Sequence, residues 1–412
     1  MSLSSAIGVE EKREESRNSA RNASRGSSKS KILSKAFRPT GAPAEQVEYY
    51  SVKVGSSKRN NHLNRYHNLE AYDRTRVIVT ADGSTQNVQQ NDAIRGGYLN
   101  ASWVLEKYGH KWWIATQAPL PQTAHSFLGL LLQPVTPPGL LSSTSASTPT
   151  SPTTRVRTVV QLTQNVESGR TKAHAYFPNT VGKSLIVPAE NGWQASPFKV
   201  TLLRQETVQE ACCLRSTVAI VPIGHPPPLN IDTYEDAEFD ENGDGQSGTE
   251  FGEQLDKRVI FTHLLYTSWP DHGVPEEQDR ASLISFIQLA DRLNRDTSLV
   301  TSPLQPHSVQ PNLNPDPPII VGCSAGVGRT GTFIALSSLL RSFGILPPPA
   351  HPGNPSPALE HSPLGPLPEE MKDDCVAHEI DSLREQRQRM VERPEQAILI
   401  YEMLMDVFTY QP

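Results

Sequence analysis

Cys323 and Arg329 lie six positions apart, and their residue types and spacing predict a reactive site. They flank a glycine-rich turn between an apolar β-branched run, residues 318–321, and an apolar helical pattern over residues 333–340. A strand that leads through such a turn into a helix makes an anion pocket, because backbone N–H groups and the positive end of the helix dipole face one ligand. A free thiol has a pKa of about 8.5, and such a pocket stabilises its thiolate. We therefore expect Cys323 to be a nucleophile that attacks a bound oxyanion.

The residues around the cysteine suit a phosphate. Arg329 offers a planar fork of donors for two phosphate oxygens, a geometry that lysine does not match. Glycines in the turn let the backbone approach the ligand without an intervening Cβ. The hydroxyl of Thr330 can hydrogen-bond the sulfur and make it a better leaving group.

Two simpler interpretations compete with this one. Residues 326–331 also match the G-x-G-x-x-G pattern of dinucleotide sites, but that pattern requires an acidic residue about 20 positions on, where this chain is rich in proline. Cys323 could also be a packed core thiol, as free cysteines often are. A core thiol needs neither the glycine turn nor the arginine, so we favour the nucleophile.

The Cys-x5-Arg string resembles the signature of the protein tyrosine phosphatases, and the fuller segment resembles their classical, phosphotyrosine-specific branch. The resemblance extends from about Asn64 to Tyr401, with insertions, and several motifs recur in the family's order. It implies that the turn binds the substrate phosphate with Ser324, Ala325, Gly326, Val327, Gly328 and Arg329.

Residues 269–273, Trp-Pro-Asp-His-Gly, resemble the mobile acid loop of this family. Cleavage of a phosphate ester needs a proton on the leaving oxygen, and a carboxylic acid on a closing loop can supply it. The resemblance makes Asp271 the acid, with Trp269 and Gly273 as hinges. A structural turn is the simpler interpretation of Pro-Asp-x-Gly, but the position of this segment before Cys323 favours the acid loop.

Four further residues acquire expected roles from the resemblance. Tyr66 would wall a deep slot and stack on the substrate ring, and Asn68 would contact the substrate backbone. Glu167 would pair with Arg329, and Lys172 would face the active site. Without the other motifs, a structural tyrosine and a solvated hairpin would be the simpler interpretations.

The segment 390–396 resembles the family's water-positioning loop. The chain departs from the family pattern at two positions, one in this segment and one beside Cys323. Gln396 matches the family's second glutamine, whereas Glu392 replaces the first. Gly322 stands where the family places a histidine before the cysteine, so one expected support for the thiolate is missing.

The elements that must position these residues follow from hydrophobic periodicity. Strands are expected at 98–104, 113–119 and 157–163, and helices at 121–133, 275–294, 375–390 and 395–410. The resemblance implies an α/β fold: a single phosphatase-like domain whose strongly twisted mixed β-sheet is flanked by helices.

Composition suggests one catalytic domain with flexible low-complexity insertions. Residues 1–45 are rich in Ser, Arg and Lys and predict a disordered tail, so the catalytic domain is expected over 46–412. Insertions rich in Pro, Ser, Thr or acidic residues are expected at about 134–154, 225–256, 296–317 and 345–372.

The net charge of −6 argues against general nucleic-acid binding. The four cysteines lack metal-ligand spacing, so we expect neither metal nor other cofactor and a reducing compartment, the cytoplasm or also the nucleus. No apolar run approaches the roughly 18 residues of a membrane span. The oligomeric state does not follow from the sequence.

The expected activity is hydrolysis of phosphotyrosine in partner proteins through a cysteinyl-phosphate intermediate, with Asp271 as general acid and then base. Two alternatives stay open. Gly322 and Glu392 would fit a catalytically weak phosphotyrosine-binding module, and a shallower slot would give a dual-specificity phosphatase.

Overall fold

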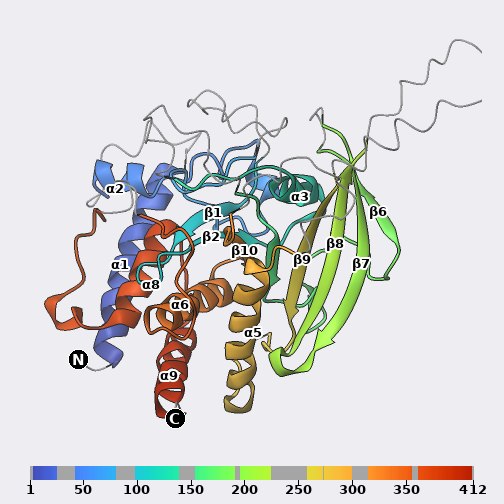
Figure 1. Ribbon diagram of the computed structural model, residues 1–412. Coiled ribbons are helices and arrows are strands. Elements are labelled where there is room, and N and C mark those ends of the chain that lie inside the picture. The colour runs from blue at the N-terminus through green and yellow to red at the C-terminus, as the bar shows by residue number, and fades with distance from the viewer. Residues whose placement is uncertain are drawn as a thin grey trace, which may run out of the picture.

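An eight-stranded mixed sheet crosses the computed structural model of the chain (Figure 1), which describes residues 3–25, 42–79, 98–138, 154–190, 195–223, 258–271, 273–298, 314–354 and 361–410. The strand order is β1-β2-β10-β3-β9-β8-β7-β6. The strands are β1 (Ala101–Leu105), β2 (Trp112–Gln117), β3 (Thr158–Gln161), β6 (Ser184–Val187), β7 (Phe198–Val208), β8 (Cys213–Pro222), β9 (Val259–Tyr266) and β10 (Ile319–Cys323). A separate two-stranded hairpin pairs β4 (Val166–Glu167) with β5 (Arg170–Thr171).

Strand β10 lies inside the sheet and ends at the predicted nucleophile. It pairs in parallel with β2 on one side, where Cys323 lies opposite Gln117, and with β3 on the other. Ile319, Ile320 and Val321 are fully buried, as expected for a continuous β-branched run in a central parallel strand. Ligands bind outside the carboxyl ends of such strands, so this register places Cys323 at a binding edge.

Helices cover both faces of the sheet, as the sequence predicts for this fold. One core cluster joins Val321 and Cys323 to α5 (Glu277–Arg295), α6 (Gly328–Ser342), α8 (Cys375–Gln386) and α9 (Pro394–Tyr410). The other joins Ile320 to α3 (Ala124–Leu132). Successive residues of β10 therefore face opposite cores, which is the period of a strand. The short helices are α2 (Ala44–Tyr49), η1 (Asn61–Leu63), η3 (Pro121–Thr123), η5 (Gln209–Ala211) and η6 (Glu369–Met371).

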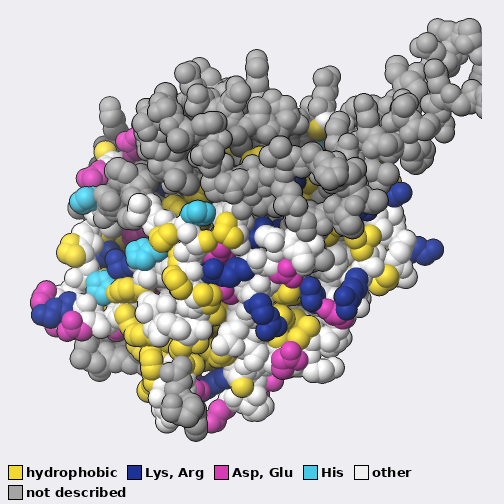
Figure 2. Space-filling model, viewed as in Figure 1, with side chains coloured by type: hydrophobic (Ala, Val, Ile, Leu, Met, Phe, Trp, Pro, Cys, Tyr) yellow, Lys and Arg dark blue, Asp and Glu magenta, His cyan; other side chains and the backbone are white. Residues whose placement is uncertain are grey.

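The surface over α6 and α9 carries hydrophobic side chains (Figure 2). Near their C-terminal ends the rings of Phe343 and Phe408 meet edge to face, with centroids 4.9 Å apart. Among the described residues, none of the helices combines the length and hydrophobicity that a membrane crossing requires.

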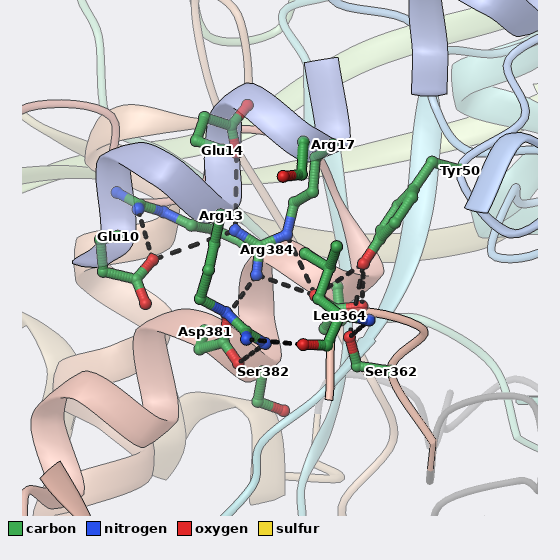
Figure 3. Close-up of polar contacts among 12 residues, drawn as sticks. Glu10, Arg13, Glu14, Arg17, Tyr50, Ser362, Leu364, Asp381, Ser382 and Arg384 are labelled. Atoms are coloured by element: carbon green, nitrogen blue, oxygen red, sulfur yellow. Dashed lines mark hydrogen bonds and ion pairs between the residues drawn. The ribbon is translucent and has the colours of Figure 1, made fainter. Parts of the chain in front are cut away.

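The prediction of a disordered tail over residues 1–45 is wrong for α1 (Leu3–Ser24), which lies beside α8 (Figure 1). Arg13 donates two hydrogen bonds of 2.9 Å to the carboxylate of Asp381 (Figure 3). Arg17 donates bonds of 3.0 and 2.8 Å to Glu385. The arginines that gave the segment its polar composition are buried in these ion pairs. Hydropathy cannot anticipate a helix held mainly by charge. Residues 26–41 lie outside the described part of the chain.

The expected insertions fall largely outside the described residues, which omit 139–153, 224–257, 299–313 and 355–360. The described parts of the 345–372 insertion, however, pack on the domain. Leu346 and Met371 are buried, and Arg13 donates to the carbonyl oxygens of Leu364 and Gly365 at 3.3 and 3.0 Å. Flexibility is therefore the wrong description of these parts, since backbone carbonyls there accept hydrogen bonds from a buried side chain.

Candidate active site

The predicted phosphate loop lies between β10 and α6. Cys323 ends the strand and is 6% exposed, residues Ser324, Ala325, Gly326 and Val327 form the turn, and Gly328 begins the helix. Gly326 has φ of +71°, and a Cβ there would lie 2.2 Å from the Thr116 carbonyl oxygen. Only glycine meets both conditions. The turn therefore lies against β2 and holds the cysteine at the N-terminal end of a fifteen-residue helix.

A steric constraint explains why glycine occupies position 322 in this chain. A Cβ at this position would lie 2.7 Å from the same Thr116 oxygen. The carbonyl of Gly322 also accepts a hydrogen bond of 2.8 Å from the Leu162 amide. A side chain such as the family's histidine would therefore require β2 or β10 to shift.

Arg329 is fixed by a bidentate pair with Glu167. Its two terminal nitrogens donate to the two carboxylate oxygens at 2.7 and 3.0 Å. Glu167 also accepts hydrogen bonds from the Thr163 hydroxyl at 2.8 Å and the Gln164 amide at 3.0 Å. This pairing is the one that the sequence predicts. Because the geometry is bidentate, it sets the plane of the guanidinium as well as its position.

The acid loop lies against Arg329. The guanidinium donates a hydrogen bond of 2.7 Å to the Pro270 carbonyl, and Trp269 is 3% exposed. The Trp269 indole donates at 3.4 Å to the Gly273 carbonyl, so the two predicted hinge residues contact each other. His272 lies outside the described residues.

Asp271 points to Lys172, whose ammonium lies 2.6 Å from the Asp271 carboxylate. The hydrogen bond from Lys172 is the main cause that holds the pKa of Asp271 well below its usual range, against the opposing effect of desolvation. A hydrogen bond from Ser168 lowers it further. In this arrangement Asp271 is a carboxylate, and Lys172 stabilises its ionised form against protonation.

A short hydrogen-bond chain links the predicted slot to the phosphate loop. The Ser324 hydroxyl donates to the Lys172 carbonyl at 2.8 Å and lies 2.9 Å from the Tyr66 hydroxyl. Tyr66 is 38% exposed, so much of its ring is accessible to a ligand. Asn68 is exposed and lines a cavity of about 480 Å³ that extends to α1 and the loop around Glu392.

Gln396 and Glu392 differ in their surroundings. Gln396 is 5% exposed, and its amide lies against the first residue of α6: a Cβ on Gly328 would be 2.9 Å from Nε2. Glu392 instead pairs with Arg389 at 3.1 Å, and its side chain is 30% exposed. The structure therefore brings Gln396 into contact with the start of α6, whereas the Glu392 carboxylate is paired with Arg389.

Thr330 is fully buried, and its hydroxyl has no hydrogen-bond partner within the described ranges. Buried hydroxyls are usually satisfied, so such an atom calls for an explanation. A role toward the sulfur, as expected from the sequence, is consistent with this.

Arg387 is a residue that the sequence analysis missed. It is 1% exposed and donates to the carbonyls of Gly326 and Ala325 at 2.7 and 3.1 Å, and it also contacts Ser102 and Asn100. Burial lowers the pKa of this guanidinium to about 10. The sequence pattern predicts a helix through Met390, whereas α8 ends at Gln386. That early end turns Arg387 beneath the phosphate loop.

Known proteins are similar in sequence to this chain. The family model for the protein-tyrosine phosphatase domain matches residues 60–134 and 153–344, which is more than half of the chain. Human tyrosine-protein phosphatase non-receptor type 13 is 23% identical over 86% of this chain and 10% of its own length. The Lar-like tyrosine-protein phosphatase of Caenorhabditis elegans is 26% identical over 72% of this chain and 10% of its own.

A third relative, human phosphatidylinositol phosphatase PTPRQ, is 28% identical over 68% of this chain and 8% of its own length. The chain thus spans about a tenth or less of the length of these relatives. The match to the family model nevertheless covers both the sheet and the phosphate loop, so the chain belongs to the protein-tyrosine phosphatase family.

Proposed function

We propose that the chain hydrolyses phosphotyrosine in proteins, in two steps through a cysteinyl-phosphate intermediate. The observation that carries the proposal is the position of Arg329, which holds Glu167 on one side and the acid loop, through the Pro270 carbonyl, on the other. One guanidinium thereby joins the loop that would bind phosphate to the loop that would supply a proton.

In the first step the Cys323 thiolate attacks phosphorus, and the bond from phosphorus to the tyrosine oxygen breaks. Asp271 gives its proton to that oxygen, so tyrosine leaves as the neutral phenol. Arg329 and the backbone N–H groups of the loop stabilise the equatorial oxygens. The proton on Asp271 requires Lys172 to release the carboxylate when substrate enters.

In the second step a water molecule, placed by Gln396, attacks phosphorus and the bond to sulfur breaks. Asp271, now ionised, accepts the proton of that water, and inorganic phosphate and the thiolate are the products. The buried hydroxyl of Thr330 supports sulfur as the leaving group. The cytoplasmic location expected from the sequence stays a prediction.

Substrate choice is tested at Tyr66. Tyr66→Ala removes a stacking wall that contributes only where the substrate carries a ring, so kcat/KM on a phosphotyrosine peptide should fall roughly two- to tenfold. The rate on a matched phosphoserine peptide should be unchanged relative to wild type. Tyr66→Phe, which keeps the ring and loses the contact with Ser324, is the control and should retain the preference.

Three results, from the peptide assay and from wild-type measurements of binding and substrate preference, decide between the candidate functions. Equal losses on both peptides would mean that the slot is shallow, as in a dual-specificity enzyme. Binding of the phosphotyrosine peptide by wild type without release of phosphate would indicate the binding module. A wild-type preference for a phosphatidylinositol phosphate, a class named for one relative, would reject phosphotyrosine proteins as the substrates.

Lys172 provides a pH-dependent test of the acid. An acid must carry its proton to donate it, so kcat/KM falls as pH rises through its pKa. Lys172 holds the Asp271 pKa low, and Lys172→Ala should therefore move the alkaline limb of the pH profile to higher pH. Lys172→Arg keeps the cation and should leave the limb in place. An alkaline limb that stays put or moves to lower pH in Lys172→Ala would contradict the assignment.

A further inference from the structure

The loop between α8 and α9 is held by Arg384. Its Nε donates to the Met390 carbonyl at 2.9 Å and its Nη2 to the Val391 carbonyl at 2.7 Å. Arg389 and Val391 have φ of +58° and +55°. Non-glycine residues seldom adopt this conformation, least of all β-branched ones, and it persists only when surrounding contacts enforce it. The two hydrogen bonds from Arg384 are such contacts.

This loop touches the phosphate loop directly. The Val391 amide donates to the Val327 carbonyl at 3.3 Å. A Cβ on Gly331 would lie 2.3 Å from the Val391 nitrogen, so the loop also packs on the first turn of α6 without room for a side chain. The next residues lead to Gln396, which lies against Gly328. A displacement of Val391 would therefore change the surroundings of the residue that is expected to place water.

Arg384 has a third partner, and it comes from α1. Its Nη1 lies 2.7 Å from the Glu10 carboxylate, 374 positions away in the sequence. Both side chains are largely buried, with 13% and 14% exposed. The same two helices also share the pair of Arg13 with Asp381 (Figure 3) and the pair of Arg17 with Glu385. Glu10 thus binds Nη1 of Arg384, while Nε and Nη2 bind the loop carbonyls.

We propose that α1 takes part in catalysis. Glu10 acts through Arg384 as a positioning residue for the loop 389–396, and the position of this loop sets the rate of the second step. The inference rests on the proposed two-step reaction. Without the carboxylate, the Arg384 guanidinium can turn away from the two carbonyls, and the strained backbone of the loop can relax. The first step depends on Cys323, Arg329 and Asp271, and the contacts described above for Arg329 and Asp271 come from Glu167, Leu162, Pro270 and Lys172, which lie outside α1.

The test uses the full chain, an aryl phosphate and its ³²P-labelled form. In Glu10→Gln we expect kcat to fall roughly three- to tenfold while kcat/KM, which ends with the first irreversible step, is unchanged. The fraction of protein that carries phosphate after an acid quench at steady state should rise. Glu11→Gln is the matched control, because Glu11 is exposed on the neighbouring position and should leave both values at wild type.

A general loss of structure would have a different signature. If kcat and kcat/KM fell together, or if the phosphorylated fraction did not rise, the proposal would be overturned. Arg384→Gln and the double variant Glu10→Gln/Arg384→Gln complete the test. If Glu10 acts through Arg384, Glu10→Gln should have no further effect once Arg384 is replaced. Additive losses in the double variant would also overturn the proposal. A wild-type protein that forms no phosphoenzyme would instead reject the proposed function.

Discussion

Cys323→Ser is expected to abolish phosphatase turnover and to leave the fold intact. A serine hydroxyl stays protonated at neutral pH and is a weak nucleophile without a base beside it. The substitution is nearly isosteric at a strand end where Cys323 is 6% exposed, so thermal unfolding should be close to that of wild type. The measurement is phosphate release from a phosphotyrosine peptide, alongside binding of the same peptide, which the variant should retain.

Two of the other three cysteines, Cys213 and Cys375, provide controls. Burial raises the pKa of the Cys213 thiol to about 12, and burial also raises the pKa of Cys375. Both should therefore react slowly with iodoacetate, and Cys375→Ser, half-buried at the start of α8, should keep full activity. Alkylation should label Cys323 first and stop turnover in step with labelling. Activity above about 2% of wild type in Cys323→Ser, where the expected loss exceeds roughly a hundredfold, would exclude the covalent route.

The sequence predicts the parts of the site that depend on local pattern and parallel topology. Cys323 ends the central strand β10, and the hairpin that carries Glu167 follows the neighbouring strand β3. The acid loop with Asp271 follows β9, the next strand in the sheet. Since these strands run in parallel, their following loops meet at one edge. The resemblance assigns these residues to one site, and the parallel strands of the structure give the physical reason for their proximity.

What the sequence does not predict is the part that rests on buried charge. Arg17 lies in the segment predicted to be a disordered tail and Arg387 has no predicted role, yet they are 0% and 1% exposed. Each finds its partners hundreds of positions away or in backbone carbonyls of another loop. Such contacts depend on tertiary register, which hydropathy and periodicity do not contain. The same reason hides the fit of Gly322 against β2, because the oxygen that excludes a Cβ belongs to Thr116.

Arg329→Lys should lower kcat roughly 100- to 1,000-fold, because a single ammonium cannot replace the donors that the guanidinium holds in one plane. Arg329 binds both oxygens of Glu167 and also the carbonyls of Leu162 and Pro270. Lysine would leave Glu167 poorly paired and would free the acid loop. The four terminal N–H groups of Arg329 all donate to these carboxylate and carbonyl oxygens, so a phosphate would bind Nε–H and replace one of the two carbonyls, and lysine has no planar pair of donors for that.

The two losses can be separated by the leaving group. Release of the acid loop weakens proton donation, which matters most for a phenol of high pKa, whereas loss of the guanidinium contact with phosphate affects all substrates alike. A series of aryl phosphates should therefore show a steeper dependence of kcat/KM on leaving-group pKa in Arg329→Lys than in wild type. Arg170→Lys, an exposed arginine on β5, is the matched control and should match wild type throughout. If Arg329→Lys instead kept the wild-type slope, the hydrogen bond to Pro270 would have no part in holding the acid, and a change of less than about tenfold in kcat would exclude Arg329 as the phosphate ligand.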